Sequence, residues 1–201
     1  MDAPSNDSRL LRPEILPGSH TPWGEAQASY RYDDGIVLHC TAGHGGFHLD
    51  ERANTHVHQA WRSPTGFYEE DVDWSIVAVT FPTLFTAGER QCADQMLRHW
   101  RPDAYETVNG VFLESGESHV KDERQFRLDH AADWVVISAI MSSHQPGFVE
   151  CVAAPGGDRR SHRERRFLVA SDEYEPERFG FVIDEKRHRS YDGPSDFVSY
   201  R

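Results

Sequence analysis

The chain has 201 residues, of which 38% are hydrophobic, and its 33 acidic against 21 basic side chains give a net charge of −12. This size allows one core or two small lobes, and no stretch reaches the roughly 18 uncharged apolar residues that a membrane-spanning helix needs. The excess of acids disfavours direct binding to nucleic acid, and three scattered cysteines argue against a disulfide framework or a thiolate zinc site.

The two ends of the chain are predicted to lie outside the folded part. Residues 1–20 mix Pro, Ser, Asn and Asp without periodicity, which predicts a flexible leader, and residues 190–201 form a tail. The leader does not resemble a secretory signal, so we expect a cytoplasmic protein. We expect a single domain over 21–189. Its parts are a hairpin-helical half (21–110), a linker helix (about 115–132) and a β half (133–189).

The first ordered elements are predicted to form a β-hairpin. Its strands run from Ala26 to Tyr32 and from Ile36 to Thr41. The segment Asp33-Asp34-Gly35 joins them, since a DG pair supplies the positive φ that a tight turn needs.

The stretch TAGHGGFHLDER (41–52) follows this hairpin and is predicted to turn the chain from a strand into a helix. Its glycines, at positions 43, 45 and 46, adopt backbone angles that other residues avoid. Asp50 is placed to cap a helix that ends near Trp61.

Three more helices are predicted before residue 111. Acids just ahead of the apolar run 74–81 favour a helix from Tyr68 to Phe81, although the β-branched residues also allow a strand. Thr86-Ala-Gly-Glu89 matches a capping box. A last helix runs from Pro102 to Asn109-Gly110. The helix that the capping box opens places Cys92, Met96, Leu97 and Trp100 on one face.

The second half is predicted to be a polar helix, roughly 118–132, followed by four strands separated by turns rich in Pro and Gly. The strands are Trp134 to Met141, Phe148 to Ala153, Arg165 to Ala170 and Phe179 to Ile183. This order of elements predicts an α+β fold, with an N-terminal hairpin and helices packed on a C-terminal antiparallel β-meander.

Two histidines and three acids are the candidates for chemistry: His44, His48, Glu69, Glu70 and Asp71. Imidazole titrates near neutrality, and either histidine combined with the acids would form a nitrogen and oxygen shell suited to zinc or a redox metal. The alternative, which the sequence alone favours, is that the glycines form a plain turn and the acids satisfy the exposed N–H groups of a helix start. No metal or cofactor is therefore predicted.

Other catalytic patterns are missing from the sequence. There is no GxSxG elbow, no GxxxxGK[ST] loop and no GxGxxG fingerprint. His56 and His58 are two positions apart and would face different directions on a helix. The cysteines are predicted to be small buried hydrophobic residues.

Charged clusters and one tryptophan are candidates for partner binding. Five arginines in GGDRRSHRERR (156–166) could clamp the phosphates or carboxylates of a partner, or pair with Glu164, Asp172 and Glu173 on an ordinary hairpin. Trp23 could anchor the leader on the core or on a partner. The candidate binding residues are Trp23, Asp33, Asp34, Glu69, Glu70, Asp71, Asp73, Arg159, Arg160 and Arg163.

Several long motifs together resemble an uncharacterised family of bacterial proteins carried on plasmids, phage and integrated elements. They include TPWG, GIVLHCTAGHGGFHLDER, GFYEEDVDWSIVAVTFPTLF and RRFLVASDEYEPERFGFVID, and the resemblance covers most of residues 21–189. That family has no activity to transfer and usually has a further cysteine where this chain has Val72. The resemblance implies an accessory protein of mobile DNA.

Three functional hypotheses follow. The first is an inhibitor of host defence, of antirestriction or anti-CRISPR type, that presents carboxylates to a protein partner with a basic nucleic-acid-binding surface. The second is a metal-dependent or His/carboxylate enzyme that uses the 44–48 loop and the 69–71 acids. The third is a structural subunit of a homo-oligomer.

Overall fold

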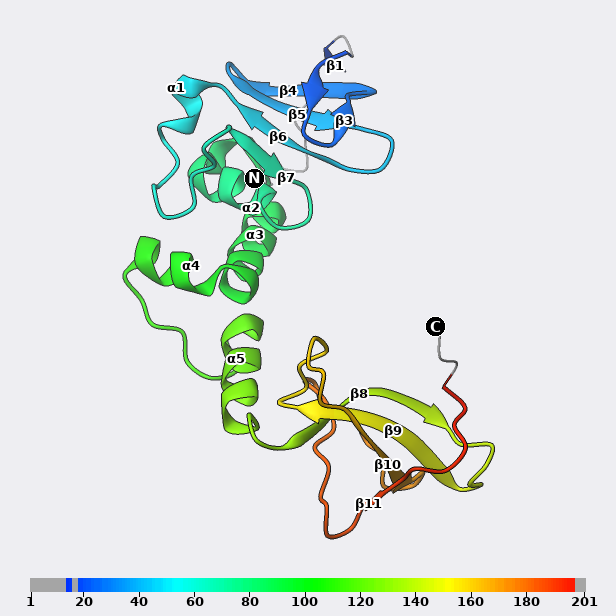
Figure 1. The fold of residues 1–201 in the computed structure, drawn as a ribbon. Helices are drawn as coiled ribbons and strands as arrows, with labels where there is room; N and C mark the ends of the chain where they lie inside the picture. The colour runs from blue at the N-terminus through cyan, green and yellow to red at the C-terminus, as the bar shows by residue number, and fades with distance from the viewer. Residues whose placement is uncertain (1–13, 16–17, 198–201) are drawn as a thin grey trace, which may run out of the picture. The chain divides into compact units, whose positions relative to one another are not determined.

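The computed structural model describes residues 14–15 and 18–197. Most of the predicted leader, residues 1–13 and 16–17, and residues 198–201 of the predicted tail lie outside the described residues. The chain divides into two compact units, residues 1–121 and residues 122–201 (Figure 1). The predicted α+β class is confirmed, since helices and antiparallel sheets both contribute. Among the described helices, none is long and apolar enough to cross a membrane.

The first unit is built on a five-stranded antiparallel sheet with the order β1-β4-β5-β6-β7. The predicted hairpin is confirmed as β4 and β5, and Gly35 in its turn has the expected positive φ of 77°. The sheet is larger than predicted, because part of the leader adds β1 and residues 45–49 and 67–69 add β6 and β7. The short hairpin β2-β3 forms a separate two-stranded sheet. The strands are β1 (Glu14–Ile15), β2 (His20–Thr21), β3 (Gly24–Glu25), β4 (Ala28–Asp33), β5 (Ile36–Cys40), β6 (Gly45–Leu49) and β7 (Phe67–Glu69).

The segment after β5 does not turn into a helix as predicted. Residues 45–49 form β6, which pairs antiparallel with β5, so the turn at 41–44 closes a second hairpin. The helix that follows is one turn long, α1 (Glu51–Asn54). Its predicted cap is confirmed, because the side chain of Asp50 accepts a hydrogen bond of 2.7 Å from the Ala53 N–H.

The sequence predicts a helix that begins at Tyr68, and this is wrong for residues 68–73. Residues 67–69 form β7, and α2 (Trp74–Thr80) begins only after a turn. Pairing with β6 at the sheet edge outweighs the favourable position of acids at a helix start. The predicted positions of the next two helices are confirmed. A single 3₁₀ turn (Pro82–Leu84) leads to α3 (Ala87–Trp100), which has the capping box, and α4 (Pro102–Asn109) ends at Gly110 with φ of 64°.

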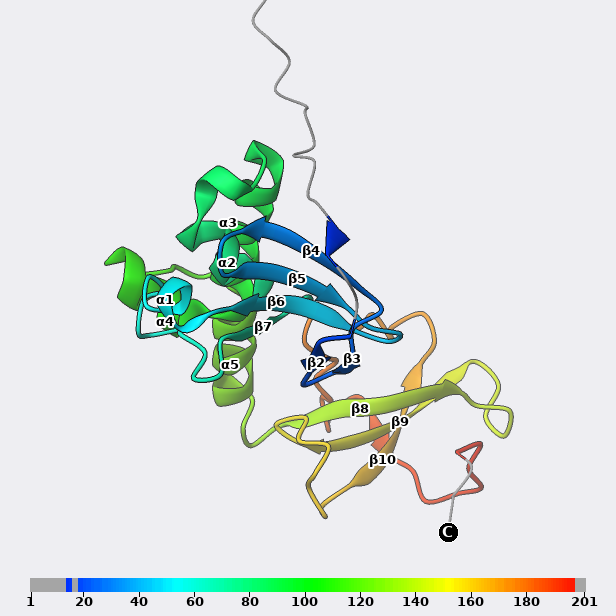
Figure 2. The same ribbon diagram turned by 90° about the horizontal axis from the view of Figure 1, so that it is seen from above.

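The core of the first unit lies between one face of the sheet and helices α2 and α3 (Figures 1 and 2). Inward side chains of β5, β6 and β7, including Phe47 and Tyr68, pack against Val77 of α2 and Leu97 of α3. The face of α3 is shifted from the prediction, since Ala93 and Leu97 are buried whereas Cys92 and Trp100 are exposed. Helix α3 therefore buries a narrow stripe of its surface.

The second unit contains a four-stranded antiparallel sheet with the order β11-β10-β9-β8. The first three predicted strands are confirmed as β8 (Trp134–Met141), β9 (Phe148–Pro155) and β10 (Arg165–Ala170), and the predicted linker helix as α5 (His119–Asp129). The fourth prediction is wrong. Residues 179–183 make isolated bridges, among them Val135 with Val182, and the fourth strand is β11 (Arg189–Ser190).

Part of the predicted C-terminal tail is packed against this sheet. Glu150 on β9 has no exposed side-chain surface, and its carboxylate accepts hydrogen bonds from Ser195 Oγ (2.6 Å), the Asp196 N–H (3.2 Å) and Arg166 (2.9 Å). Asp196 in turn accepts from the Ser143 N–H. Ser195 and Asp196 are therefore held by a buried carboxylate, a long-range contact that local sequence patterns do not reveal.

Candidate functional site

The candidate site lies at one end of the first sheet, beside the face that points away from α2 and α3. The register places His39 of β5 opposite Gly46 of β6, and Gly46 opposite Glu69 of β7, in one row across three strands. Side chains alternate between faces along each strand, and the neighbouring residues Phe47 and Tyr68 point into the core. His39, Gly46 and Glu69 therefore share the outer face.

Gly46 is required for its missing side chain and not for its backbone angles. A Cβ at this position would lie 2.3 Å from the backbone oxygen of Tyr68 and 2.4 Å from the indole of Trp23. None of the three glycines of this stretch has positive φ. Trp23, in the turn between β2 and β3, thus packs over the β6 backbone, and its ring also contacts Phe67 at 5.8 Å and His44 at 6.1 Å. This tryptophan anchors the β2-β3 hairpin on the sheet.

His44 is held at the tip of the hairpin between β5 and β6. The Thr41 hydroxyl donates to the backbone oxygen of His44 at 2.7 Å, and the His44 N–H donates back to the Thr41 oxygen at 3.2 Å. The imidazole is partly exposed, at 36% of its surface. The turn therefore presents this side chain at the end of the sheet.

The acids 69–71 stand at the end of β7, directly beside this turn. The Glu70 N–H donates to the backbone oxygen of Gly45 at 3.0 Å. The Glu69 carboxylate accepts from the N–H groups of Asp71 (2.7 Å) and Val72 (3.3 Å) and so fixes the bend that follows. The alternative in which these acids cap a helix is wrong, because even Asp73, the residue before α2, makes no side-chain capping bond.

The turn and the acids bring one histidine and three carboxylates together. His44 Nε2 lies 3.8 Å from Glu69, and His44 Nδ1 lies 3.6 Å from Glu70. One ligand atom from each of His44, Glu69 and Asp71 lies within 4.8 Å of the others. The sequence could not show that the 44–48 loop meets the acids, and in the structure it does so through His44.

His48 lies elsewhere and contributes no atom to this group. It sits on β6, where its ring stacks on Phe67 at 4.5 Å and lies 6.3 Å from His39. Burial lowers the pKa of His39, and the charge of His48 lowers it further. Burial also lowers the pKa of His48, against the opposing charge of Asp50. These two rings are part of the packing of the outer face.

The other acids proposed for partner binding have partners within the first unit. Asp34 pairs with Arg52 at 2.8 Å, and Asp73 pairs with Arg101 at 2.9 Å. Asp33 accepts a hydrogen bond from the Asp34 N–H and stays exposed. Surface charge in the hairpin turn is thus partly neutralised.

The arginine cluster of the second unit is also largely engaged, although not with the acids expected from the sequence. Arg165 pairs with Glu185 and Arg160 approaches Asp158, while Arg163 lies over the ring of Trp134. Arg159 is exposed. Among the expected partners, Glu173 instead pairs with Arg187 and His188.

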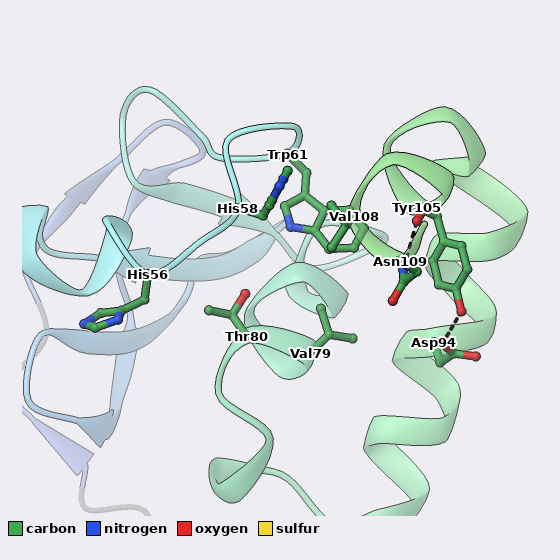
Figure 3. A pocket seen from close by; sticks show the side chains of 9 residues that line it. All are labelled: His56, His58, Trp61, Val79, Thr80, Asp94, Tyr105, Val108 and Asn109. Atoms are coloured by element: carbon green, nitrogen blue, oxygen red, sulfur yellow. Dashed lines mark hydrogen bonds between the residues drawn. The ribbon is translucent and has the colours of Figure 1, made fainter. Parts of the chain in front are cut away.

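A pocket that the sequence did not indicate lies in the helical part of the first unit, and Figure 3 shows its lining. His56 and His58 both line it, because α1 ends at Asn54 and they stand on a loop and not on a helix. Trp61 and Tyr105 are aromatic residues of its lining. The sequence could have predicted that these two histidines line one pocket only if the end of α1 had been known.

Comparison with known proteins gives one finding about family. Residues 17–131 match a family described as a domain of unknown function (DUF7007). This range includes the candidate site and ends before β8. No curated protein and no solved structure matches the chain.

Proposed function

This chain belongs to the DUF7007 family of domains of unknown function, and from that premise we propose that its first unit binds a divalent transition-metal ion through His44, Glu69 and Asp71. The observation that carries the proposal is the approach of these three side chains within 4.8 Å of one another. Two ligands of one zinc ion are at most about 4.2 Å apart, so small rotations of partly exposed side chains complete the site.

The donor set supports this class of ion. One imidazole nitrogen and two carboxylate oxygens form a mixed shell that suits zinc and its neighbours in the first transition row. Three protein ligands leave a coordination position for water, as in catalytic and not in structural zinc sites. We therefore propose that the ion activates water for a hydrolytic reaction.

Glu70 supports the same arrangement from the other side of the imidazole. A metal-bound histidine commonly donates its second ring N–H to a carboxylate, which fixes the tautomer and increases the basicity of the ligand. Glu70 lies 3.6 Å from Nδ1, while Nε2 is turned toward Glu69. The two nitrogens thus have two separate acidic neighbours, one for coordination and one for orientation.

The test is metal titration of the full chain after treatment with a chelator. Isothermal titration with Zn²⁺ should show one site, and His44→Ala and Asp71→Asn should each weaken it at least 100-fold. Glu51→Gln, an exposed acid on α1, is the matched control and should leave the affinity unchanged. Equal binding by wild type and the ligand variants would show that the ions bind nonspecifically to surface acids.

Co²⁺ substitution tests the water-activating part of the proposal. A water molecule that occupies the open coordination position should ionise close to neutral pH and so change the visible spectrum of the cobalt protein. A spectrum that stays constant between pH 6 and 9 would limit the site to metal binding without water activation.

A second function, protein binding by surface carboxylates, is favoured by the charge of the first unit. Residues 1–121 contain 18 acidic and 9 basic residues and so carry −9 of the net −12. A basic nucleic-acid-binding surface on a host nuclease is the partner that this charge fits, which would make the protein an inhibitor of host defence.

Salt dependence separates this second function from the first. Capture of a host nuclease should weaken steeply as salt rises from 0.05 to 0.5 M, on the order of tenfold or more. The His44→Ala variant should still capture it, because that change leaves the carboxylates in place. Capture that is insensitive to salt would overturn carboxylate recognition.

A further inference from the structure

The pocket shown in Figure 3 is separate from the proposed metal centre. It has a volume of about 260 Å³ and is bounded by the loop after α1, the end of α2, and helices α3 and α4. Sites that hold drug-sized ligands measure about 300–1,000 Å³. A ligand of this pocket is therefore a small molecule.

The pocket contains a buried donor that has no partner. Trp61 lines the wall, and its indole Nε1–H is buried without a hydrogen bond among the described residues. In Figure 3 the nitrogen-bearing edge of the ring is turned toward His58 and Thr80. Buried N–H groups nearly always have an acceptor, and one that lacks it in the protein marks a place for an acceptor from outside.

A second donor stands beside the indole. The Ala60 N–H donates to His58 Nδ1 at 3.1 Å, so in the neutral ring the proton is on Nε2. His58 is exposed, and its side chain can move to admit a ligand to the indole. Two N–H groups on one wall match the two oxygens of a carboxylate.

The opposite wall has a carboxylate, but its charge is largely neutralised and would repel a bound anion only weakly. Both oxygens of Asp94 are engaged, one with the Tyr105 hydroxyl at 2.7 Å and the other with Arg98 at 2.9 Å. The Arg98 charge offsets that of the carboxylate. Val79 and Val108 provide apolar surface between the two walls.

We propose that this pocket binds a small organic acid, whose carboxylate accepts from Trp61 Nε1–H and His58 Nε2–H while its apolar body packs on Val79 and Val108. The site is independent of the proposed metal centre. A ligand there would connect three helices and the loop after α1, and it would stabilise the helical side of the unit.

The experiment is a titration of the ¹⁵N-labelled full chain with sodium benzoate, followed in the indole N–H region of the spectrum. The chain has five tryptophans, and Trp61→Phe assigns the resonance of interest. A saturable shift confined to the Trp61 signal is expected. His58→Ala should weaken binding about tenfold, and His58→Gln, which keeps an N–H donor, should recover part of it.

Two controls make the result decisive. Trp100→Phe, a change at an exposed position outside the pocket lining, should leave the benzoate titration unchanged, and chelator-treated protein should bind as well as untreated protein. Absence of a saturable Trp61 shift would overturn the proposal and assign the indole N–H to a bound water. Binding of benzamide without binding of benzoate would overturn the carboxylate assignment.

Discussion

The Nδ1 atom of His44 lies 3.6 Å from the Glu70 carboxylate, although the two residues are 26 positions apart in the sequence. His44 directly precedes β6, and Glu70 directly follows β7. Glu70 is not among the three proposed ligands, and in the proposed site its place beside the second ring nitrogen would make it a positioning residue.

Removing the charge of Glu70 is the first prediction. Glu70→Gln should lower Zn²⁺ affinity by about 10–100-fold without abolishing the site, because loss of an outer carboxylate loosens the imidazole but keeps all three ligands. Competitive titration against a zinc-binding dye measures this. A loss as large as that of His44→Ala would make Glu70 a direct ligand.

Adding one methyl group to Gly46 is the second prediction. Gly46→Ala should destabilise the protein by about 1–3 kcal/mol, because the new Cβ overlaps the Tyr68 backbone oxygen and the Trp23 indole. Gly43→Ala is the matched control. No heavy atom lies within 4 Å of its new Cβ, so its effect should stay within about 0.5 kcal/mol. Urea unfolding compares the two, and equal stabilities would contradict the packing of Trp23 on β6.

Two histidines of the outer face, His39 (buried) and His48 (partly buried), predict how stability depends on pH. The pKa values of His39 and His48 are both lowered, chiefly by burial, so between these values and about 6.5 the unfolded chain binds more protons than the folded one. As far as these two groups are concerned, the free energy of unfolding should therefore be greatest above about pH 6.5 and decrease as the pH falls below that value. In His39→Gln this decrease should be smaller. An unchanged slope in the variant would contradict the prediction.

The buried carboxylate of the second unit supports a fourth prediction. Burial alone would raise the pKa of Glu150, but hydrogen bonds from Ser195, Arg166 and the Asp196 N–H lower it below its ordinary value. Arg166→Met should cost about 3 kcal/mol in unfolding free energy, since it leaves a buried charge without its cation. The control Arg165→Met removes an exposed ion pair with Glu185 and keeps an apolar side chain against the rings of Trp134 and Phe167, so it should cost at most about 1 kcal/mol. Similar losses in both variants would contradict a special role of Glu150.

The cysteines are predicted to differ in reactivity. Cys92 is exposed, whereas Cys151 is fully buried, and burial together with the charge of Glu150 raises its pKa to about 12. Iodoacetamide at pH 8 should therefore label Cys92 in the native protein and leave Cys151 unmodified until urea unfolds it. Peptide mass spectrometry reads both positions. Rapid native labelling of Cys151 would show that the second sheet opens readily.

The parts of the fold that short-range signals determine were predictable, and the parts that tertiary pairing determines were not. The hairpin turn at Gly35, the capping box at Thr86 and the helix end at Gly110 depend on local chemistry and are confirmed. Residues 45–49 and 67–69 became strands because they pair with each other at a sheet edge, which overrides their local glycines and acids.

The candidate site followed the same division. The residue types suited to chemistry could be named from the sequence, but the choice of His44 over His48 depends on which face of β6 and which end of the hairpin each occupies. The pocket near Trp61 was missed because α1 is one turn long, so that His56 and His58 lie outside any helix.

The contacts of Ser195 and Asp196 with Glu150 also set a boundary for anyone who prepares fragments of this protein. In a shortened version that stops before residue 195, the buried Glu150 carboxylate would lose two of its three hydrogen-bond donors and keep only Arg166. Such a fragment should be poorly expressed and prone to aggregate. A fragment that extends through residue 197 keeps all three hydrogen bonds to Glu150.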